Sequence, residues 1–148
     1  MISENSISYD TVNFLIVDDD LVSIKSIQRS IKQLKIANPV FIAKDGIEAL
    51  EILDRNITDT NTLPPFIITL DLSMPRMGGL EFLDNIRKND RYRKLVIFVL
   101  TTSDAPEDIA SAYDKNIAGY IVKDNPTESL KSALEMIHGY ARLVVLPR

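Results

Sequence analysis

The sequence contains no cysteine, so disulfide bonds, thiolate catalysis and cysteine-ligated zinc are excluded. It also has no apolar run that approaches the roughly 20 residues of a membrane helix. Residues 1–10 are polar and acidic, and they lack the basic and apolar segments of a secretion signal. These absences predict a cytoplasmic protein with no membrane partner.

The chain also has no large net charge of either sign. The net charge of −4 gives no electrostatic reason to expect a nucleic-acid partner, and the one basic cluster, residues 91–94, is typical of a solvated turn. The length of 148 residues, with 45% hydrophobic and 26% charged residues, fits a single soluble domain. We expect a flexible N-terminus at 1–10, one domain over 11–141 and a tail at 142–148.

Five short apolar runs are uninterrupted rather than alternating, as is typical of strands buried on both faces of a parallel sheet. They are residues 14–17, 40–43, 66–70, 95–100 and 120–122. The segments between them have helical periodicity, as in the stripe formed by Ile24, Ile27 and Ile31. Right-handed crossovers convert this order into an α/β fold, a doubly wound five-stranded parallel sheet with helices on both faces.

The connections between these segments carry local signals of their own. Asp104 with Glu107, and Asn125 with Glu128, have the spacing of a capping box at a helix start. Residues 55–65 form a polar loop, ended by two prolines, that is longer than usual. A solvated insertion is the simpler interpretation of this loop, and a functional loop is the alternative.

Polar side chains stand where four of the predicted strands end. Residues 18–20 are three consecutive aspartates after the first strand, Asp71 follows the third, Thr101 the fourth and Lys123 the fifth. Ligands of open α/β sheets bind beyond the carboxyl ends of the strands, so we expect these side chains to share one rim. Each residue alone has a simpler explanation, such as a helix cap, a strand threonine or a solvated lysine.

Together these residue types favour phosphoryl chemistry. Crowded carboxylates repel one another, and a hard divalent cation such as Mg²⁺ relieves that conflict. Lys123 can pair with a phosphoryl oxygen and the Thr101 hydroxyl can donate to another. A carboxylate that attacks phosphorus forms an acyl phosphate. The sequence therefore predicts a Mg²⁺ site beside an aspartate that accepts a phosphoryl group.

Four segments resemble, in the same order, the receiver domain of two-component response regulators. They are residues 14–19 (FLIVDD), 70–83 (LDLSMPRMGGLEFL), 100–103 (LTTS) and 119–123 (GYIVK). The resemblance covers roughly residues 12–140. It implies a flavodoxin-like sheet with strand order 2-1-3-4-5 and a regulator that accepts a phosphoryl group from a histidine kinase.

The resemblance implies a role for each acidic residue of the rim. Asp71 matches the phosphoacceptor. Asp19 matches the direct Mg²⁺ ligand, Asp18 the acid that acts mainly through water, and the carbonyl of Ser73 the backbone ligand. Asp20 has no required role and is expected to cap the first helix.

The same resemblance implies a switch. Thr101 matches the hydroxyl that moves toward the phosphoryl group, Tyr120 the aromatic that follows it, and Lys123 the invariant ammonium. The family usually has proline directly after this lysine, whereas here Asp124 follows. A cis bond before a non-proline residue is costly, so we expect a trans bond, with the negative charge of Asp124 beside the phosphate site.

One subgroup of the family fits best. Residues 100–109, Tyr113 and residues 120–123 look most like small single-domain regulators of bacteriophytochrome-type histidine kinases. This similarity implies a phytochrome-like sensor kinase as partner, with output through protein contact. The contact is a homodimer, an onward phosphorelay partner or a downstream target, and a homodimer would use the face of the fourth helix, fifth strand and fifth helix. A stripe formed by Met136 and Tyr140 and an apolar tail at 143–146 are either core or dimer surface, and core is the simpler interpretation.

Two other functions remain open. A degenerate receiver would act as a constitutive docking module; the complete acidic set and Lys123 disfavour this, whereas Asp124 favours it. An aspartate-nucleophile phosphatase would have a second aspartate two residues after the nucleophile, where this chain has Ser73. We therefore expect no enzyme activity beyond the chain's own phosphorylation and dephosphorylation.

Overall fold

The computed structural model describes residues 11–123 and 126–147, which contain one five-stranded parallel sheet of order β2-β1-β3-β4-β5. The strands are β1 (Asn13–Val17), β2 (Val40–Ala43), β3 (Phe66–Leu70), β4 (Val96–Thr101) and β5 (Gly119–Val122). The predicted fold is confirmed, and each strand begins and ends within one residue of its apolar run.

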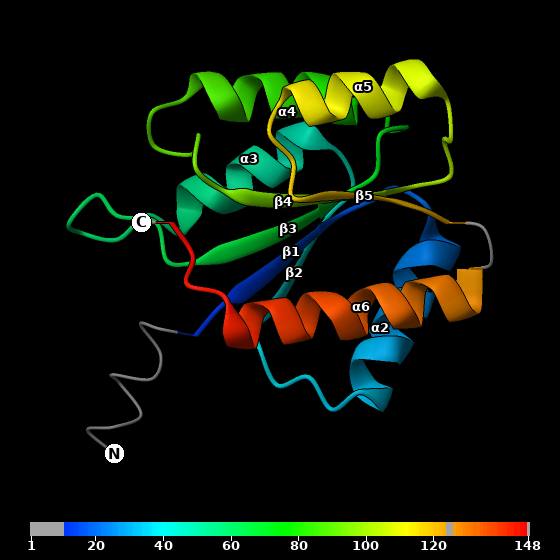
Figure 1. The fold of residues 1–148 in the computed structure, drawn as a ribbon. Coiled ribbons are helices and arrows are strands. Elements are labelled where there is room, and N and C mark those ends of the chain that lie inside the picture. Colours follow the sequence, from blue (N-terminus) through cyan, green and yellow to red (C-terminus); the bar gives the residue numbers. More distant parts are fainter. Residues whose placement is uncertain (1–10, 124–125, 148) are drawn as a thin grey trace.

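Helices cover both faces of the sheet (Figure 1). They are α2 (Leu21–Gln33), α3 (Gly46–Arg55), α4 (Gly79–Lys88), α5 (Pro106–Asp114) and α6 (Pro126–Leu143). Helices α2 and α6 pack against each other on one face, and α3, α4 and α5 lie on the other. Among the described residues, no helix has the length and apolar character needed to cross a membrane.

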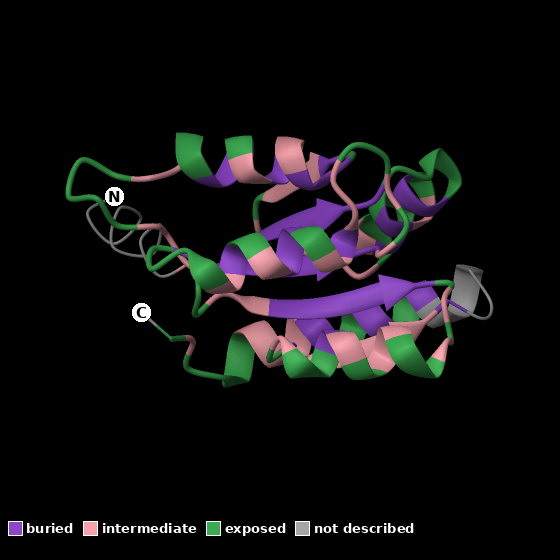
Figure 2. Ribbon diagram, turned by 90° about the horizontal axis from the view of Figure 1, so that it is seen from above, coloured by how far each residue is buried: buried purple, intermediate pink, exposed green. Residues whose placement is uncertain are grey.

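The uninterrupted apolar runs are explained by the two cores that the sheet separates. Leu15 and Ile68 point to one side, where they join the cluster that includes Phe82 of α4. Phe14, next to Leu15 in the chain, points to the other side and packs in the cluster of Ile137 of α6. Figure 2 shows the resulting layer of buried strands between the helices. Because successive side chains enter opposite cores, no position on a central strand can be polar without a partner.

Of two predicted helix caps, one is confirmed and one is wrong. Asp20 caps α2, as expected, because its side chain accepts a hydrogen bond from the Val22 backbone N–H. The predicted cap at Asp104 is wrong: α5 begins at Pro106, its N-cap is Ala105, and no side chain caps it. Proline fits the first helical position because it has no N–H to satisfy, and this placement leaves Asp104 one residue outside the cap.

The C-terminal apolar residues divide between core and surface. The Tyr140 ring contacts Phe98 edge to face, with centroids 5.2 Å apart, and Leu146 packs against the same cluster. Leu143 and Val145 are 85% and 94% exposed. Met136 and Val144 are exposed as well. The expectation of core residues is therefore confirmed for Tyr140 and Leu146 and wrong for these four exposed residues.

Several predictions lie outside the described residues. They are the flexible N-terminus at 1–10, the cap at Asn125, the trans bond after Lys123 and the charge effect of Asp124.

Candidate functional site at the carboxyl edge of the sheet

Three aspartates gather at the carboxyl edge of the sheet. Oxygen atoms of Asp18, Asp19 and Asp71 all lie within 4.8 Å of one another. Asp18 and Asp71 are buried, whereas Asp19 is exposed. The cluster thus combines two acids in a low-dielectric setting with a third that solvent can reach.

The register of the two central strands places these acids side by side. Val17 of β1 is level with Leu70 of β3, so Asp18 and Asp71 each leave the sheet one residue later at the same height. The Asp71 N–H donates to the Val17 carbonyl (2.9 Å), and the Asp18 N–H donates to Ala43 of β2 (3.0 Å). Backbone pairing therefore continues through both aspartates and fixes where their side chains begin.

Asp71 has a buried hydrogen-bond donor. The Thr101 hydroxyl, which is fully buried at the end of β4, donates to Oδ1 of Asp71 over 2.7 Å. Burial raises the pKa of the Asp71 carboxyl, whereas the Thr101 hydrogen bond and the positive charge of Lys123 lower it; Asp18 raises it, and the net shift is upward. An oxygen with a raised pKa is a stronger base and a better nucleophile than an ordinary carboxylate.

Lys123 reaches the cluster from β5. Its Nζ donates to Oδ2 of Asp18 over 2.6 Å and to the Ser23 hydroxyl over 3.3 Å. The Ser23 hydroxyl in turn donates to Oδ2 of Asp20 over 3.0 Å. Sequence reasoning missed Ser23; its position three residues after Asp20, on the first turn of the helix above the cluster, was the available signal.

Tyr120 links β5 to the connection that follows Thr101. Its hydroxyl donates to the Ser103 carbonyl over 2.8 Å, and its backbone N–H donates to the Tyr113 hydroxyl over 3.2 Å. The Ser103 hydroxyl donates to Asp108 of α5 over 2.6 Å. A movement at the end of β4 would therefore also shift Tyr120 and α5, which are hydrogen bonded to Ser103.

The segment from Asp71 to Gly79 passes close to the acids. Ser73 is exposed, and its N–H lies 3.5 Å from Oδ1 of Asp71. The Gly79 N–H closes the segment by donating to the Leu72 carbonyl over 3.0 Å. A Cβ on Gly79 would lie 2.5 Å from the Asp71 carbonyl oxygen, so only glycine allows this approach.

The donor set fits a hard divalent cation. It offers only oxygen atoms, spaced so that two or more carboxylates can face one ion, and exposed Asp19 leaves a side open for water. Mg²⁺ prefers oxygen ligands, keeps several waters and is usually held by one or two carboxylates. The neighbouring Lys123 ammonium supplies a further positive charge at the same rim.

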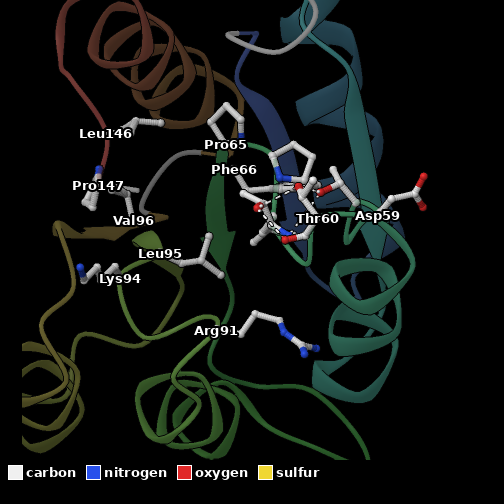
Figure 3. Close-up of a pocket in the computed structure, with 14 residues that line it drawn as sticks. Asp59, Thr60, Pro65, Phe66, Arg91, Lys94, Leu95, Val96, Leu146 and Pro147 are labelled. Carbon is white, nitrogen blue, oxygen red and sulfur yellow. Dashed lines mark hydrogen bonds between the residues drawn. The ribbon is translucent and has the colours of Figure 1, made fainter.

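A cavity of about 530 Å³ lies at the opposite, amino-terminal edge of the sheet (Figure 3). The loop at 58–65 forms one wall, and the start of β4 and Leu146 form others. Within the loop, the hydroxyls of Thr58 and Thr60 are 2.9 Å apart, and both residues are exposed. The long loop is thus solvated at its tip, and it is far from the carboxyl edge.

The sequence is similar to a known protein family and to individual relatives. Residues 14–135 match the family described as response regulator receiver domain. The probable methanogenesis regulatory protein FilR2 of Methanothrix harundinacea is 30% identical over 131 residues, which cover 88% of this chain and 84% of the relative. Response regulator Rcp1 of Synechocystis is 29% identical over 125 residues, which cover 84% and 83%.

Two solved structures share the fold of most of the chain. The Mn²⁺-bound form of Rcp1 superimposes with a TM-score of 0.78 at 27% identity, covering 93% of this chain and 99% of that one. The phosphorylated cyanobacterial phytochrome response regulator RcpA superimposes with a TM-score of 0.79 at 27% identity, covering 92% and 98%.

Proposed function

The chain belongs to the response regulator receiver family, and from that premise we propose that Asp71 is its phosphoacceptor. The chain is a phosphoacceptor domain of two-component signalling and not a classical enzyme. The single observation that carries the assignment of Asp71 is its position: it is buried, hydrogen bonded to Thr101 and within 4.8 Å of two other acids. We assign the receiver to residues 11–141, followed by a tail at 142–148.

The divalent cation is Mg²⁺, held by Asp18, Asp19, Asp71 and the carbonyl of Ser73. Rcp1, which has the same fold, was solved with Mn²⁺ bound, a cation with the same preference for oxygen ligands. When bound, the ion neutralises the carboxylates and the negative charge on the phosphoryl oxygens. The carboxylates of Asp18, Asp19 and Asp71 already lie close enough to one another to bind one ion.

The protein's own groups perform the transfer. A carboxylate oxygen of Asp71 attacks the phosphorus of a phosphohistidine; a P–O bond forms, the P–N bond breaks, and the electron pair leaves on the histidine nitrogen. Thr101 and Lys123 are placed to donate to phosphoryl oxygens, which carry most of the charge in this reaction. The new contacts favour a second conformation in which Thr101 and then Tyr120 shift.

The partner that supplies the phosphoryl group is a sensor histidine kinase of the phytochrome type. Receiver domains take phosphoryl groups from histidine kinases, and the relatives Rcp1 and RcpA support the phytochrome type for this chain. Output passes through the α5–β5–α6 face as a homodimer. Tyr113 and Met136, which are 50% and 46% exposed, lie on helices of this face.

Acetyl phosphate with Mg²⁺, followed by intact-mass analysis, tests the phosphoacceptor. The wild-type chain should gain the mass of one phosphoryl group, and Asp71→Asn should gain none. Asp59→Asn is the matched control, because it removes an exposed acid at the opposite edge of the sheet. No gain in the wild-type chain would instead favour a constitutive docking module.

Phosphotransfer tests the partner. A kinase of the bacteriophytochrome type, autophosphorylated with radioactive phosphate, should transfer that phosphoryl group to this chain within minutes. A chemotaxis-type kinase should transfer it much more slowly. Equal rates from the two kinases would contradict the phytochrome assignment while leaving the phosphoacceptor intact.

A further inference from the structure

An ion pair joins two loops at the rim of the site. Nε of Arg76, in the connection between β3 and α4, donates to Oδ2 of Asp45 over 2.7 Å. Asp45 ends the connection between β2 and α3 and is only 4% exposed, whereas the Arg76 side chain is 56% exposed. One partner is therefore anchored inside the protein and the other reaches it from a surface loop.

Asp45 is held rigidly on its own side. It is the N-cap of α3, and its Oδ1 accepts the backbone N–H of Glu48 over 2.9 Å. Burial on its own raises the pKa of the Asp45 carboxyl, but the hydrogen bonds from Arg76 and Glu48 outweigh it, and the pKa is lowered. The carboxylate is thus a fixed anion, with each oxygen directed at a different partner.

The loop that carries Arg76 is held against α3 by more than this pair. The Gly46 N–H donates to the Met77 carbonyl over 3.1 Å, and a Cβ on Gly46 would lie 2.7 Å from the Met77 side chain. Arg76 itself has a φ of 60°, in the left-handed region that a residue with a Cβ rarely adopts. Such a conformation persists only where the surroundings enforce it, and here they lie on the rim of the site.

We infer that Arg76 is a positioning residue for the metal site. It lies three residues after Ser73, whose carbonyl is a ligand under the proposed function, on which this inference rests. By tying this loop to the N-terminus of α3, the Arg76–Asp45 pair fixes the height of that carbonyl above Asp71. Groups that orient metal ligands typically change affinity about tenfold or more when they are removed.

A simple surface ion pair would behave differently. Exposed pairs contribute little to stability, and such a pair would not hold the Ser73 carbonyl in place. Electrostatics alone also predicts the opposite sign, because loss of a positive charge near a cation site should tighten cation binding. Weaker Mg²⁺ binding after removal of Arg76 is therefore a result that only positioning explains.

Arg76→Gly is the sharpest variant, since glycine accepts a φ of 60° without strain and the change should leave the fold intact. We expect the Kd for Mg²⁺, measured by isothermal titration calorimetry on the folded variant, to rise about tenfold. The Tm should fall as well, because the buried Asp45 carboxylate loses its partner. Phosphorylation by acetyl phosphate should need more Mg²⁺ but reach the wild-type rate at saturation. Arg93→Gln, at an exposed arginine 3.8 Å from Asp90, is the charge-matched control and should bind Mg²⁺ normally.

Asp45→Asn completes the test, because asparagine also serves as an N-cap and keeps the acceptor for Glu48. Combined with Arg76→Gln, it should weaken Mg²⁺ binding no further than Arg76→Gln alone. An unchanged or lower Kd in Arg76→Gly, or a fall in Tm with no change in Kd, overturns the positioning role only. No Mg²⁺ binding by the wild-type chain overturns the proposed function as well.

Discussion

Nζ of Lys123 lies 2.6 Å from Oδ2 of Asp18, and the two side chains are only 4% and 3% exposed. Each partner makes a second hydrogen bond, Lys123 to the Ser23 hydroxyl and Asp18 to the backbone N–H of Asp20. The pair therefore joins the ends of β5 and β1 across the rim of the site. Under the proposed function, it also places the ammonium close to a phosphoryl group on Asp71.

Removing one partner of this pair should be costly. Lys123→Met leaves the Asp18 charge buried without its partner, and we expect the free energy of unfolding to fall by about 3–5 kcal/mol. The double variant with Asp18→Asn should recover part of that loss, because residue 18 then carries no buried charge that lacks its partner. Urea unfolding followed by circular dichroism, in buffer containing EDTA, measures both changes.

The control for this prediction is Lys88→Met. Lys88 is 75% exposed and lies 3.5 Å from Asp84, so its loss should cost about 0–1 kcal/mol. Similar small losses in Lys123→Met and Lys88→Met would show that the buried pair is not coupled to the fold as the geometry indicates.

Arg87 should be the most sensitive arginine for stability. Its guanidinium donates to four backbone carbonyls in the connections after α4 and α5; they belong to Arg93, Leu95, Lys115 and Asn116. Arg87→Lys keeps the charge but cannot reproduce this fork, and we expect a loss of about 2–3 kcal/mol in urea unfolding. The exposed Arg93→Lys should be nearly neutral, and an equal loss in both variants would contradict the role of Arg87.

The sequence was most informative where the signals are local. A strand buried on both faces must be apolar at every position, so β3 could be read directly from residues 66–70. The parallel order then brought the strand ends together, and with them Asp18 and Asp71. The acidic cluster was therefore predictable from the chain order alone.

Contacts between distant loops were not predictable in the same way. Asp45 and Arg76 are 31 residues apart, and no periodicity indicates that two connections will touch. Ser23 looked like one of several polar residues on α2 until β5 placed Lys123 beside it. The expected cap at Asp104 failed because the spacing of a capping box competed with the preference of Pro106 for the first helical position.

Tyr92 should make stability depend on pH in the alkaline range. Its side chain is 1% exposed and its hydroxyl donates to Asp54. Burial, together with that hydrogen bond, raises the pKa of Tyr92 to about 12, compared with 10.0 for an ordinary tyrosine. The folded chain therefore keeps this proton when the unfolded chain has lost it. The stabilisation is complete below pH 10 and is lost as the pH rises to about 12.

Tyr92→Phe isolates this effect. The difference in free energy of unfolding between the wild-type chain and the variant should be largest below pH 10 and shrink steadily toward pH 12. Groups that titrate in both proteins cancel in the difference, so urea unfolding at several pH values measures Tyr92 alone. A difference that stays constant over this range would contradict the raised pKa.

Two glycines should respond in opposite ways to the same substitution. A Cβ on Gly79 would lie 2.5 Å from the Asp71 carbonyl oxygen and 2.7 Å from Cα of Leu72, and neither backbone atom can move without shifting Asp71, the proposed phosphoacceptor. Gly79→Ala should therefore cost about 1–3 kcal/mol and slow phosphorylation by acetyl phosphate. A Cβ on Gly139, within α6, would have no described heavy atom within 4 Å apart from its chain neighbours and the backbone of its own helix. Gly139→Ala should gain about 0.5–1 kcal/mol from helix propensity with no change in phosphorylation, and a loss of stability there would show that α6 is packed more tightly than the structure indicates.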